Sequence, residues 1–284
     1  MAAAEPMSLR VTTFGRAEVL VGGVAAEWRA QAARDLFFYL LSHPEGRAKE
    51  EILETLWGLN PDAAASNRFR VTVHRLRAAL EMPGAVVEEH GRYHLSPDVF
   101  LASDIHSLYS ALDEANRAPD APARLSAYEK AIHVYQGDYL PGERADWASG
   151  AREEHKAAYV RAALELSLLL CDQSSCLASV NALVRAMRAD PYIGENYHQK
   201  LMTCLSVVEG KYSAIEHYRR FLSFLRDELE DTPMLETREL AERIKAGEQI
   251  CRRHEGPDAP LTENCPLTPD GRCPGVLGDL LNVN

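Results

Sequence analysis

The stretch Ala63–Glu81 (AAASNRFRVTVHRLRAALE) limits the fold most, because its residues follow a helical pattern with two unlike faces. Four arginines and no acidic residue occur between Ala63 and Leu80. An apolar stripe recurs with the period of 3.6 residues that is typical of an α-helix. The stripe consists of Phe69, Val73, Leu76 and Leu80. The pattern predicts an amphipathic helix that buries one face and presents a basic face.

The polar face of this predicted helix carries residue types that suit DNA. Arginine can pair with guanine, asparagine can pair with adenine, and cations placed against phosphates gain from counterion release. For this stretch taken alone, an ordinary solvated basic face is the alternative. The side chains that point away from the stripe or flank it are Asn67, Arg68, Arg70, Val71, His74, Arg75, Arg77 and Ala78.

The residues on both sides of the helix predict a complete small domain. Short strands are expected first, then two helices, and after Ala63–Glu81 a hairpin with Arg92 at its tip. The order is typical of a winged helix-turn-helix with an N-terminal antiparallel sheet, in which the third helix enters the major groove. It favours DNA binding. The expected elements are strands Leu9–Phe14, Glu18–Val21 and Ala25–Trp28, a helix from Gln31 to the break at residues 43–46, a helix Lys49–Trp57, and hairpin strands Val86–Glu89 and Tyr93–Leu95.

Charge separates the first hundred residues from the rest of the chain. Residues 1–100 carry 11 Lys+Arg and 13 Asp+Glu, whereas residues 101–284 carry 20 and 29, so the net charges are -2 and -9. Only the first segment suits contact with DNA. No apolar run approaches the ~20 residues of a membrane span, and the N-terminus does not look like a signal peptide. We therefore expect a cytosolic protein without a membrane partner.

The chain after residue 100 is predicted to be almost wholly helical. Helix pairs with short connections suggest stacked helical repeats, and the stretch from Asp190 to Phe221 fits the tetratricopeptide pattern loosely. A plain helical bundle is the alternative. The expected fold class is a multidomain, mainly α protein: a winged helix-turn-helix domain at 1–100, an all-α tetratricopeptide-like domain at 101–252, and a flexible tail at 253–284. The expected helices are Ile105–Arg117, Pro122–Gln136, Ala148–Asp172, Cys176–Asp190, Ile193–Glu209, Tyr212–Leu229 and Pro233–Arg252.

No sequence motif indicates an enzyme or a cofactor. The chain has no nucleophile elbow, HExxH motif or Gly-rich phosphate loop. The one candidate metal or oxidant-sensing set is Cys251, His254, Cys265 and Cys273, whose soft ligands could hold zinc. Their spacing matches no standard zinc module, so stray cysteines in a flexible tail are the simpler interpretation. We expect no catalytic residue, cofactor or bound metal.

Several motifs, in order, resemble one family of bacterial regulators. The family is the antibiotic-regulatory-protein type (SARP), in which an OmpR-like winged helix is joined to a bacterial transcriptional activation domain (BTAD). The resemblance spans roughly residues 9–250. It rests on Ala33–Pro44 (ARDLFFYLLSHP), Glu50–Trp57 (EEILETLW), Asn67–Leu80 (NRFRVTVHRLRAAL), Gly91–Leu95 (GRYHL), Gly137–Gly142 (GDYLPG), Trp147 with Arg152-Glu153, and Asp190-Pro191 through His198, Leu201-Met202 and Gly210.

The resemblance implies a sequence-specific regulator that binds direct repeats in promoters, with two copies side by side on double-stranded DNA. It also implies contact with RNA polymerase, usually to activate transcription. His74 stands where the family often has a small hydroxyl residue, and no P-loop follows the helical domain. The positions that match the family's DNA-reading helix are Asn67, Arg68, Arg70, Val71, His74, Arg75 and Arg77, and Arg92 matches its wing.

A second hypothesis comes from another functional class. The acidic helical domain could bind a protein partner or a small effector, for example a nucleotide second messenger, so that the protein is a ligand sensor or scaffold. Arginines can pair with phosphates, although most of them are expected to be solvated or ion-paired on helix surfaces. The arginines concerned are Arg144, Arg152, Arg185, Arg188, Arg219 and Arg220.

Overall fold

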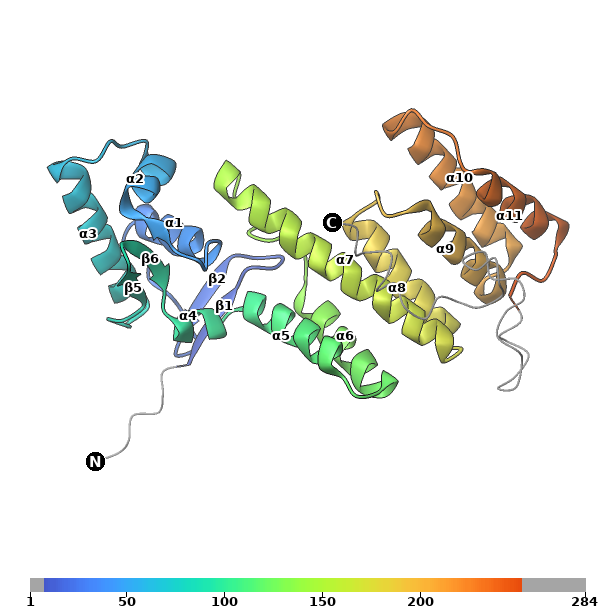
Figure 1. Cartoon of the computed structure of the whole chain (residues 1–284), viewed down its shortest axis with the longest axis horizontal. Helices are drawn as coiled ribbons and strands as arrows, with labels where there is room; N and C mark the ends of the chain where they lie inside the picture. Colours follow the sequence, from blue (N-terminus) through green and yellow to red (C-terminus); the bar gives the residue numbers. More distant parts are fainter. Residues whose placement is uncertain (1–7, 252–284) are drawn as a thin grey trace. The chain divides into compact units, whose positions relative to one another are not determined.

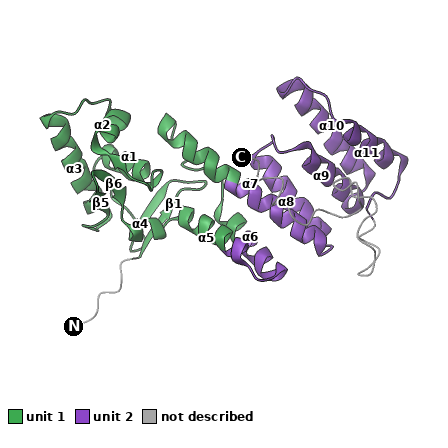
Figure 2. Cartoon of the chain, viewed as in Figure 1, with its two compact units in different colours: residues 1–113, 130–157 green, residues 114–129, 158–284 purple. Residues whose placement is uncertain are grey.

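The computed structural model describes residues 8–251, drawn in Figure 1, and these residues are mainly helical. They divide into two compact units (Figure 2). The first unit contains residues 8–113 and 130–157, and the second contains residues 114–129 and 158–251. Within the described ranges, no helix is long and apolar enough to cross a membrane.

The first unit begins with a three-stranded antiparallel sheet in the order β1-β2-β3. In this sheet β1 (Leu9–Thr12) pairs with β2 (Glu18–Val21), which pairs with β3 (Val24–Ala25). The third strand is present as predicted, but it was expected at Ala25–Trp28 and ends at Ala25. Trp28 leaves the sheet and packs on Phe37, with 5.5 Å between the ring centroids. A large aromatic ring gains more from apolar contact than from a place on an exposed strand edge.

Three helices follow, close to the predicted bounds: α1 (Gln31–Leu41), α2 (Lys49–Trp57) and α3 (Ala63–Ala79). α1 and α3 pack on each other. A second sheet has the order β4-β6-β5, in which β5 (Val86–Glu89) and β6 (Arg92–Leu95) form the expected hairpin. The third member, β4 (Arg47–Ala48), was not predicted. Its two residues carry no strand pattern, and they become a strand only by pairing with β6.

The start of α3 is held by a side-chain cap. The Asp62 carboxylate accepts a hydrogen bond of 2.6 Å from the Ala65 backbone N–H, one of the N–H groups that a helix start leaves unpaired. We expect Asp62→Ala to lower the free energy of unfolding by about 1 kcal/mol, measured by urea denaturation. Asp62→Asn is the matched control, because asparagine caps about as well. An equal loss in both variants would show that capping is not the cause.

A segment from far along the chain lies beside β1 in the first unit. The Gly15 N–H donates to the Asp138 carbonyl (3.0 Å), and the Leu140 N–H donates to the Thr13 carbonyl (2.9 Å). The approach requires glycine: a Cβ at Gly15, whose φ is +76°, would lie 2.8 Å from the Gln136 carbonyl oxygen. The stretch Gly137–Gly142 therefore completes the N-terminal sheet region.

The side chain of Asp104 also holds the residues that follow β1. Its carboxylate accepts hydrogen bonds from the Thr13 N–H (2.6 Å), the Thr13 hydroxyl (2.6 Å) and the Phe14 N–H (2.9 Å). The ring of Phe14 is buried and lies near Tyr135, Tyr139 and His155. Residues 130–157 are thus packed into the first unit by an aromatic cluster as well as by backbone hydrogen bonds.

The seven helices expected after residue 100 are present. In the second unit, α9 packs against α8, α10 and α11, so its middle section is buried on nearly every side. A short helix α4 (Pro97–Leu101) and a 3₁₀ turn (Asp146–Ala148) were not predicted. The seven helices are α5 (Asp104–Arg117), α6 (Ala121–Val134), α7 (Ser149–Asp172), α8 (Cys176–Ala189), α9 (Glu195–Val208), α10 (Lys211–Glu228) and α11 (Leu235–Ala246).

Candidate nucleic-acid interface

The apolar side of α3 is anchored in the core of the first unit. Phe69, Val73, Leu76 and Leu80 are all buried, as the stripe predicts. Phe69 also packs edge-on against Tyr93 of β6, with 4.7 Å between the ring centroids. The helix is therefore held by the core on one side and by the hairpin at one flank, which determines which residues it exposes.

The opposite side of α3 is solvent-exposed and carries no acidic side chain. We call it the α3 exposed face. Arg68 lies over the Trp57 ring, with its guanidinium carbon 5.1 Å from the centroid, so this cation is placed beside α2. The α3 exposed face consists of Asn67, Arg68, Arg70, Val71, His74 and Arg75, six of the eight residues proposed from the sequence.

The other two proposed residues have partners inside the unit. Arg77 is half-buried, and its Nη2 donates a 2.9 Å hydrogen bond to the carbonyl of Val86 in β5. Arg92 donates to the Gly46 carbonyl from Nε (3.2 Å) and from Nη2 (2.8 Å). Both guanidinium groups therefore join the hairpin to the rest of the unit.

The tip of the hairpin differs from the expectation that placed an arginine there. The strands are joined by His90 and Gly91, whose φ values are +52° and +78°, and Arg92 is the first residue of β6. A two-residue turn with positive φ at both positions suits the right-handed twist of a hairpin. The outermost residues are thus His90 and Gly91, and Arg92 lies at the base of the turn.

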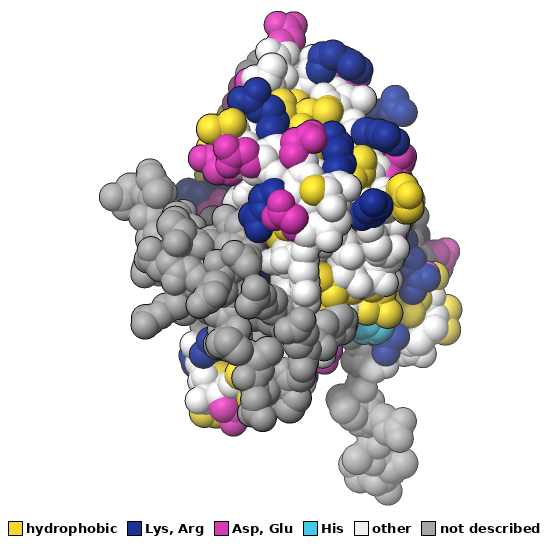
Figure 3. Space-filling model, turned by 90° about the vertical axis from the view of Figure 1, so that its right-hand side faces the viewer, with side chains coloured by type: hydrophobic (Ala, Val, Ile, Leu, Met, Phe, Trp, Pro, Cys, Tyr) yellow, Lys and Arg dark blue, Asp and Glu magenta, His cyan; other side chains and the backbone are white. Residues whose placement is uncertain are grey.

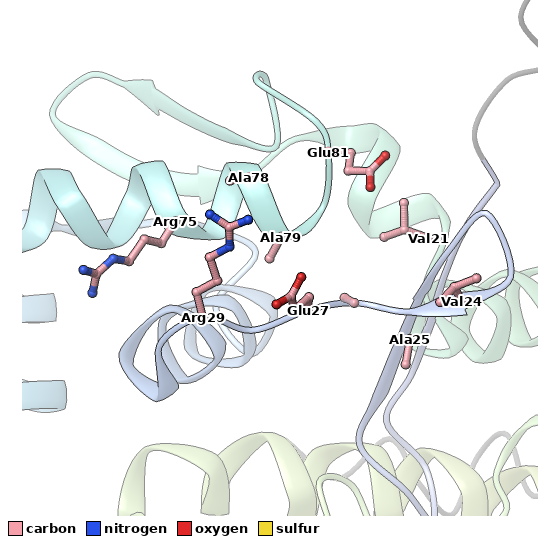
Figure 4. A pocket seen from close by; sticks show the side chains of 10 residues that line it. Val21, Val24, Ala25, Glu27, Arg29, Arg75, Ala78, Ala79 and Glu81 are labelled. Carbon is pink, nitrogen blue, oxygen red and sulfur yellow. The ribbon is translucent and has the colours of Figure 1, made fainter.

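The structure brings two further cations to the borders of the α3 exposed face. A cavity of about 340 Å³ is lined by Arg29 and by Arg75 among others, and Figure 4 shows Arg29 reaching toward α3 from the segment before α1. A second cavity, of about 390 Å³, is lined by Lys49 at the start of α2 and by Arg70. Sequence reasoning missed both, because neither Arg29 nor Lys49 belongs to a basic cluster in the sequence.

The second cavity also contains a tyrosine that stays neutral. The hydroxyl of Tyr93 donates a 2.8 Å hydrogen bond to the Glu88 carboxylate. Burial and this acidic neighbour raise the pKa of Tyr93 to about 12. Tyr93 thus adds a hydrogen-bonding group to the cavity wall without adding charge.

The described residues contain no group of three or more His, Cys, Asp and Glu arranged to hold a metal ion. Of the four residues considered for zinc, Cys251 is the last described residue and is partly exposed. His254, Cys265 and Cys273 lie outside the described residues.

The class of protein is shown by comparison with known proteins, which places the chain among bacterial transcriptional regulators. Residues 102–245 match the family described as bacterial transcriptional activator domain. The chain therefore belongs to this family, and the resemblance to SARP-type regulators is confirmed.

Two similar curated proteins have the same name in two organisms. The chain is 28% identical over 208 residues to Regulatory protein AfsR of Streptomyces coelicolor. The aligned region covers 70% of this chain and 20% of that protein. It is 27% identical over 261 residues to Regulatory protein AfsR of Streptomyces griseus, with coverage of 88% and 26%. The chain thus spans about a quarter or less of the length of these relatives.

A solved structure shows the same fold. The structure of Mycobacterium tuberculosis EmbR in complex with a low-affinity phosphopeptide aligns with a TM-score of 0.66 and 17% identity, covering 88% of this chain and 68% of that one. At this identity the match shows the fold.

Proposed function

We propose that this protein is a sequence-specific DNA-binding transcriptional regulator that activates transcription. The observation that carries the proposal is the α3 exposed face: six exposed residues, three of them arginines, on a helix whose other side is buried. A third helix with this construction, followed by a hairpin, is the element that a winged helix-turn-helix inserts into the major groove. Among the described residues no acidic side chain belongs to this face, and Glu27, Glu81 and Glu88 line the two cavities at its borders.

The residues of the interface are proposed to divide between reading bases and holding phosphates. Arg70 and Arg75 have exposed guanidinium groups on the central turns of α3, where they can pair with guanine O6 and N7, and Asn67 can pair with adenine. Arg29 and Lys49 border the same face from the segment before α1 and from α2, a position that suits the flanking phosphates.

Arg77 and Arg92 are proposed to support the interface from within the protein. Each donates hydrogen bonds to a backbone carbonyl, Arg77 to β5 and Arg92 to the residue before β4. A second contact to a phosphate is open to Arg92, whose side chain is 43% exposed. His90 and Gly91 at the hairpin tip are the residues that can reach the neighbouring minor groove or backbone.

The proposed partners follow from the family. We propose that two copies bind promoter direct repeats side by side, that the protein contacts RNA polymerase, and that it acts by binding and not by catalysis. The curated relatives are named as regulatory proteins, which supports this. We also propose that the helices of residues 101–252 form a tetratricopeptide-like domain, in which α9 packs against α8, α10 and α11.

The second candidate, a sensor or scaffold, is favoured by exposed apolar side chains on the second unit. Tyr192 and Tyr212 are 60% and 83% exposed, and aromatic side chains are enriched at protein–protein interfaces. A nucleotide ligand for such a sensor is less well supported, because arginines proposed to bind its phosphates have partners within the protein. Arg152 donates to the Tyr139 and Glu143 carbonyls, and Arg219 and Arg220 lie within 4 Å of Glu216.

The surface of α10 and α11 also gives little support to a nucleotide-binding site. Figure 3 shows that Lys and Arg side chains alternate there with Asp, Glu and apolar side chains. Arg226 is paired with Asp227 and Lys245 with Glu242. A phosphate ligand would have to compete with these carboxylates.

The proposal is tested by fluorescence anisotropy with the intact protein, a promoter fragment that contains direct repeats, and a scrambled fragment. We expect tight binding to the promoter fragment only, and affinity that falls steeply between 50 and 200 mM salt, roughly 10³-fold for six phosphate contacts. Equal and weak binding to both fragments would contradict the proposal. It would direct attention to the second unit as the binding surface.

A further inference from the structure

Three cysteines from three helices meet in the second unit. Cys171 lies at the end of α7, Cys176 is the first residue of α8, and Cys204 lies in α9. The Cys204 thiol is hydrogen-bonded to Cys171, and both Cys171 and Cys176 act electrostatically on it. All three are thiols in this structure, without a disulfide bond. The cluster is distinct from the tail cysteines considered for metal binding.

The three thiols differ in their access to solvent. Cys171 is partly exposed, whereas Cys176 and Cys204 are each 7% exposed. A hollow of about 550 Å³ beside the cluster is lined by Ser174, Ser175, Cys176 and residues of α8 and α9. Small polar reagents can therefore reach Cys176 through this hollow, whereas Cys171 is itself partly exposed.

The thiols also differ in their tendency to ionise. The hydrogen bond to Cys171 and burial raise the pKa of the Cys204 thiol well above its usual value, while the nearby Lys200 acts in the opposite direction. Cys204 thus keeps its proton, and Cys171 is the sulfur of the pair that an oxidant in solvent meets first, because it is partly exposed. When one cysteine is oxidised to a sulfenic acid, a second thiol in contact with it can condense with it to a disulfide.

We propose that Cys171 and Cys204 form an oxidant-responsive dithiol, in which a hydroperoxide converts the pair to a disulfide that links α7 to α9. In the first step the Cys171 thiolate attacks the peroxide oxygen, the O–O bond breaks, and one proton is taken up. The products are the Cys171 sulfenic acid and water or an alcohol. In the second step the Cys204 sulfur attacks the sulfenic sulfur, an S–S bond forms and the S–O bond breaks. The Cys204 proton goes to the leaving oxygen, which departs as water. The two thiols together lose two electrons, which reduce the peroxide.

The test uses the full-length protein, fully reduced and then exposed to hydrogen peroxide. Digestion by a protease that cleaves before aspartate separates Cys171 from Cys176, because Asp172 follows Cys171 directly. Mass spectrometry is expected to find a peptide pair joined through Cys171 and Cys204 that disappears on reduction. Thiol counting in denaturant should show a loss of two of the six thiols. Neither measurement depends on a variant that must fold.

Cysteine-to-serine variants identify which thiols form the cross-link. Cys171→Ser and Cys204→Ser should each abolish the cross-link, and Cys251→Ser should leave it unchanged. Oxidised wild-type protein should melt at a higher temperature than reduced protein, and the shift should be absent in the Cys171→Ser variant, because a cross-link restricts the unfolded chain. A cross-link from Cys204 to Cys176, a cross-link confined to Cys251, Cys265 and Cys273, or no loss of thiols would overturn the proposal.

Discussion

Replacement of both Arg70 and Arg75 by alanine is expected to weaken binding to promoter DNA by at least ~30-fold, because each base-reading arginine contributes roughly 1–3 kcal/mol. Both side chains are exposed on α3, where they can reach the base edges of a docked duplex. The core stripe on the other side of α3 is untouched, so the melting temperature should stay the same. Fluorescence anisotropy with the promoter fragment measures the loss, and a scrambled fragment shows how much of it is specific.

Two control variants separate an effect on DNA recognition from an effect on protein stability. Arg226→Ala removes an exposed arginine of α10 that is paired with Asp227, and it should leave the DNA affinity unchanged. Arg77→Ala removes the hydrogen bond to Val86, and it should lower the melting temperature. If the double variant binds as tightly as the wild type, α3 is not the reading helix.

Acidification from pH 7.5 to about 4 is expected to destabilise the second unit through His198 and His217, each of which would contribute about 3 kcal/mol if it titrated alone. Burial is the main cause that lowers the pKa of His198 to about 3 and that of His217 to about 4. A neighbouring side chain also lowers each pKa, His217 for the first and Arg220 for the second. In the unfolded chain both titrate near 6.5. The folded state therefore favours the neutral rings, so their contribution to stability is complete above pH 6.5 and is lost as the pH falls toward the folded pKa values.

The geometry explains why a proton is costly there. His198 Nδ1 lies 3.3 Å from His217 Nε2, so one ring donates to the other, and the His198 ring stacks on Phe221 at 4.0 Å. His198 Nε2 is buried and has no hydrogen-bond partner among the described residues. If both rings were protonated, His198 Nδ1 and His217 Nε2 would both be donors and would face each other. The contributions of the two rings are consequently coupled and are not additive.

Thermal melts between pH 7.5 and 4 measure the effect. His198→Leu should flatten the pH dependence, although it lowers the stability at pH 7.5. His133→Gln, at an exposed position of α6, is the control and should keep the wild-type slope. His155 in the first unit, whose pKa burial lowers to about 4, should contribute its own acid loss in every variant. An unchanged slope in His198→Leu would refute the role of the pair.

Short-range sequence patterns were enough to predict the helices that form the candidate interface. The bounds of α2 (Lys49–Trp57) agree with the prediction, and α3 begins at Ala63 as expected. In both cases an apolar stripe is bounded by a residue that ends or caps a helix: Gly58 in the left-handed region after α2, and Asp62 before α3. Because these signals act within a few residues, they can be read without knowledge of the rest of the chain. The domain boundary near residue 100 and the roles of the eight DNA-binding candidates stay predictions.

Contacts between distant residues could not be read in this way. Sequence alone determined the amphipathic helices, the hairpin and the exposed basic face, since the periodicity of apolar side chains requires a buried side and an exposed side. Only the tertiary structure decided that Arg92 turns to Gly46, that Arg29 borders Arg75, that Gly137–Gly142 completes the N-terminal sheet region, and that Cys171 meets Cys204. Each of these pairings depends on where the packed elements bring side chains that are far apart in the chain, and short-range propensity carries no information about that distance.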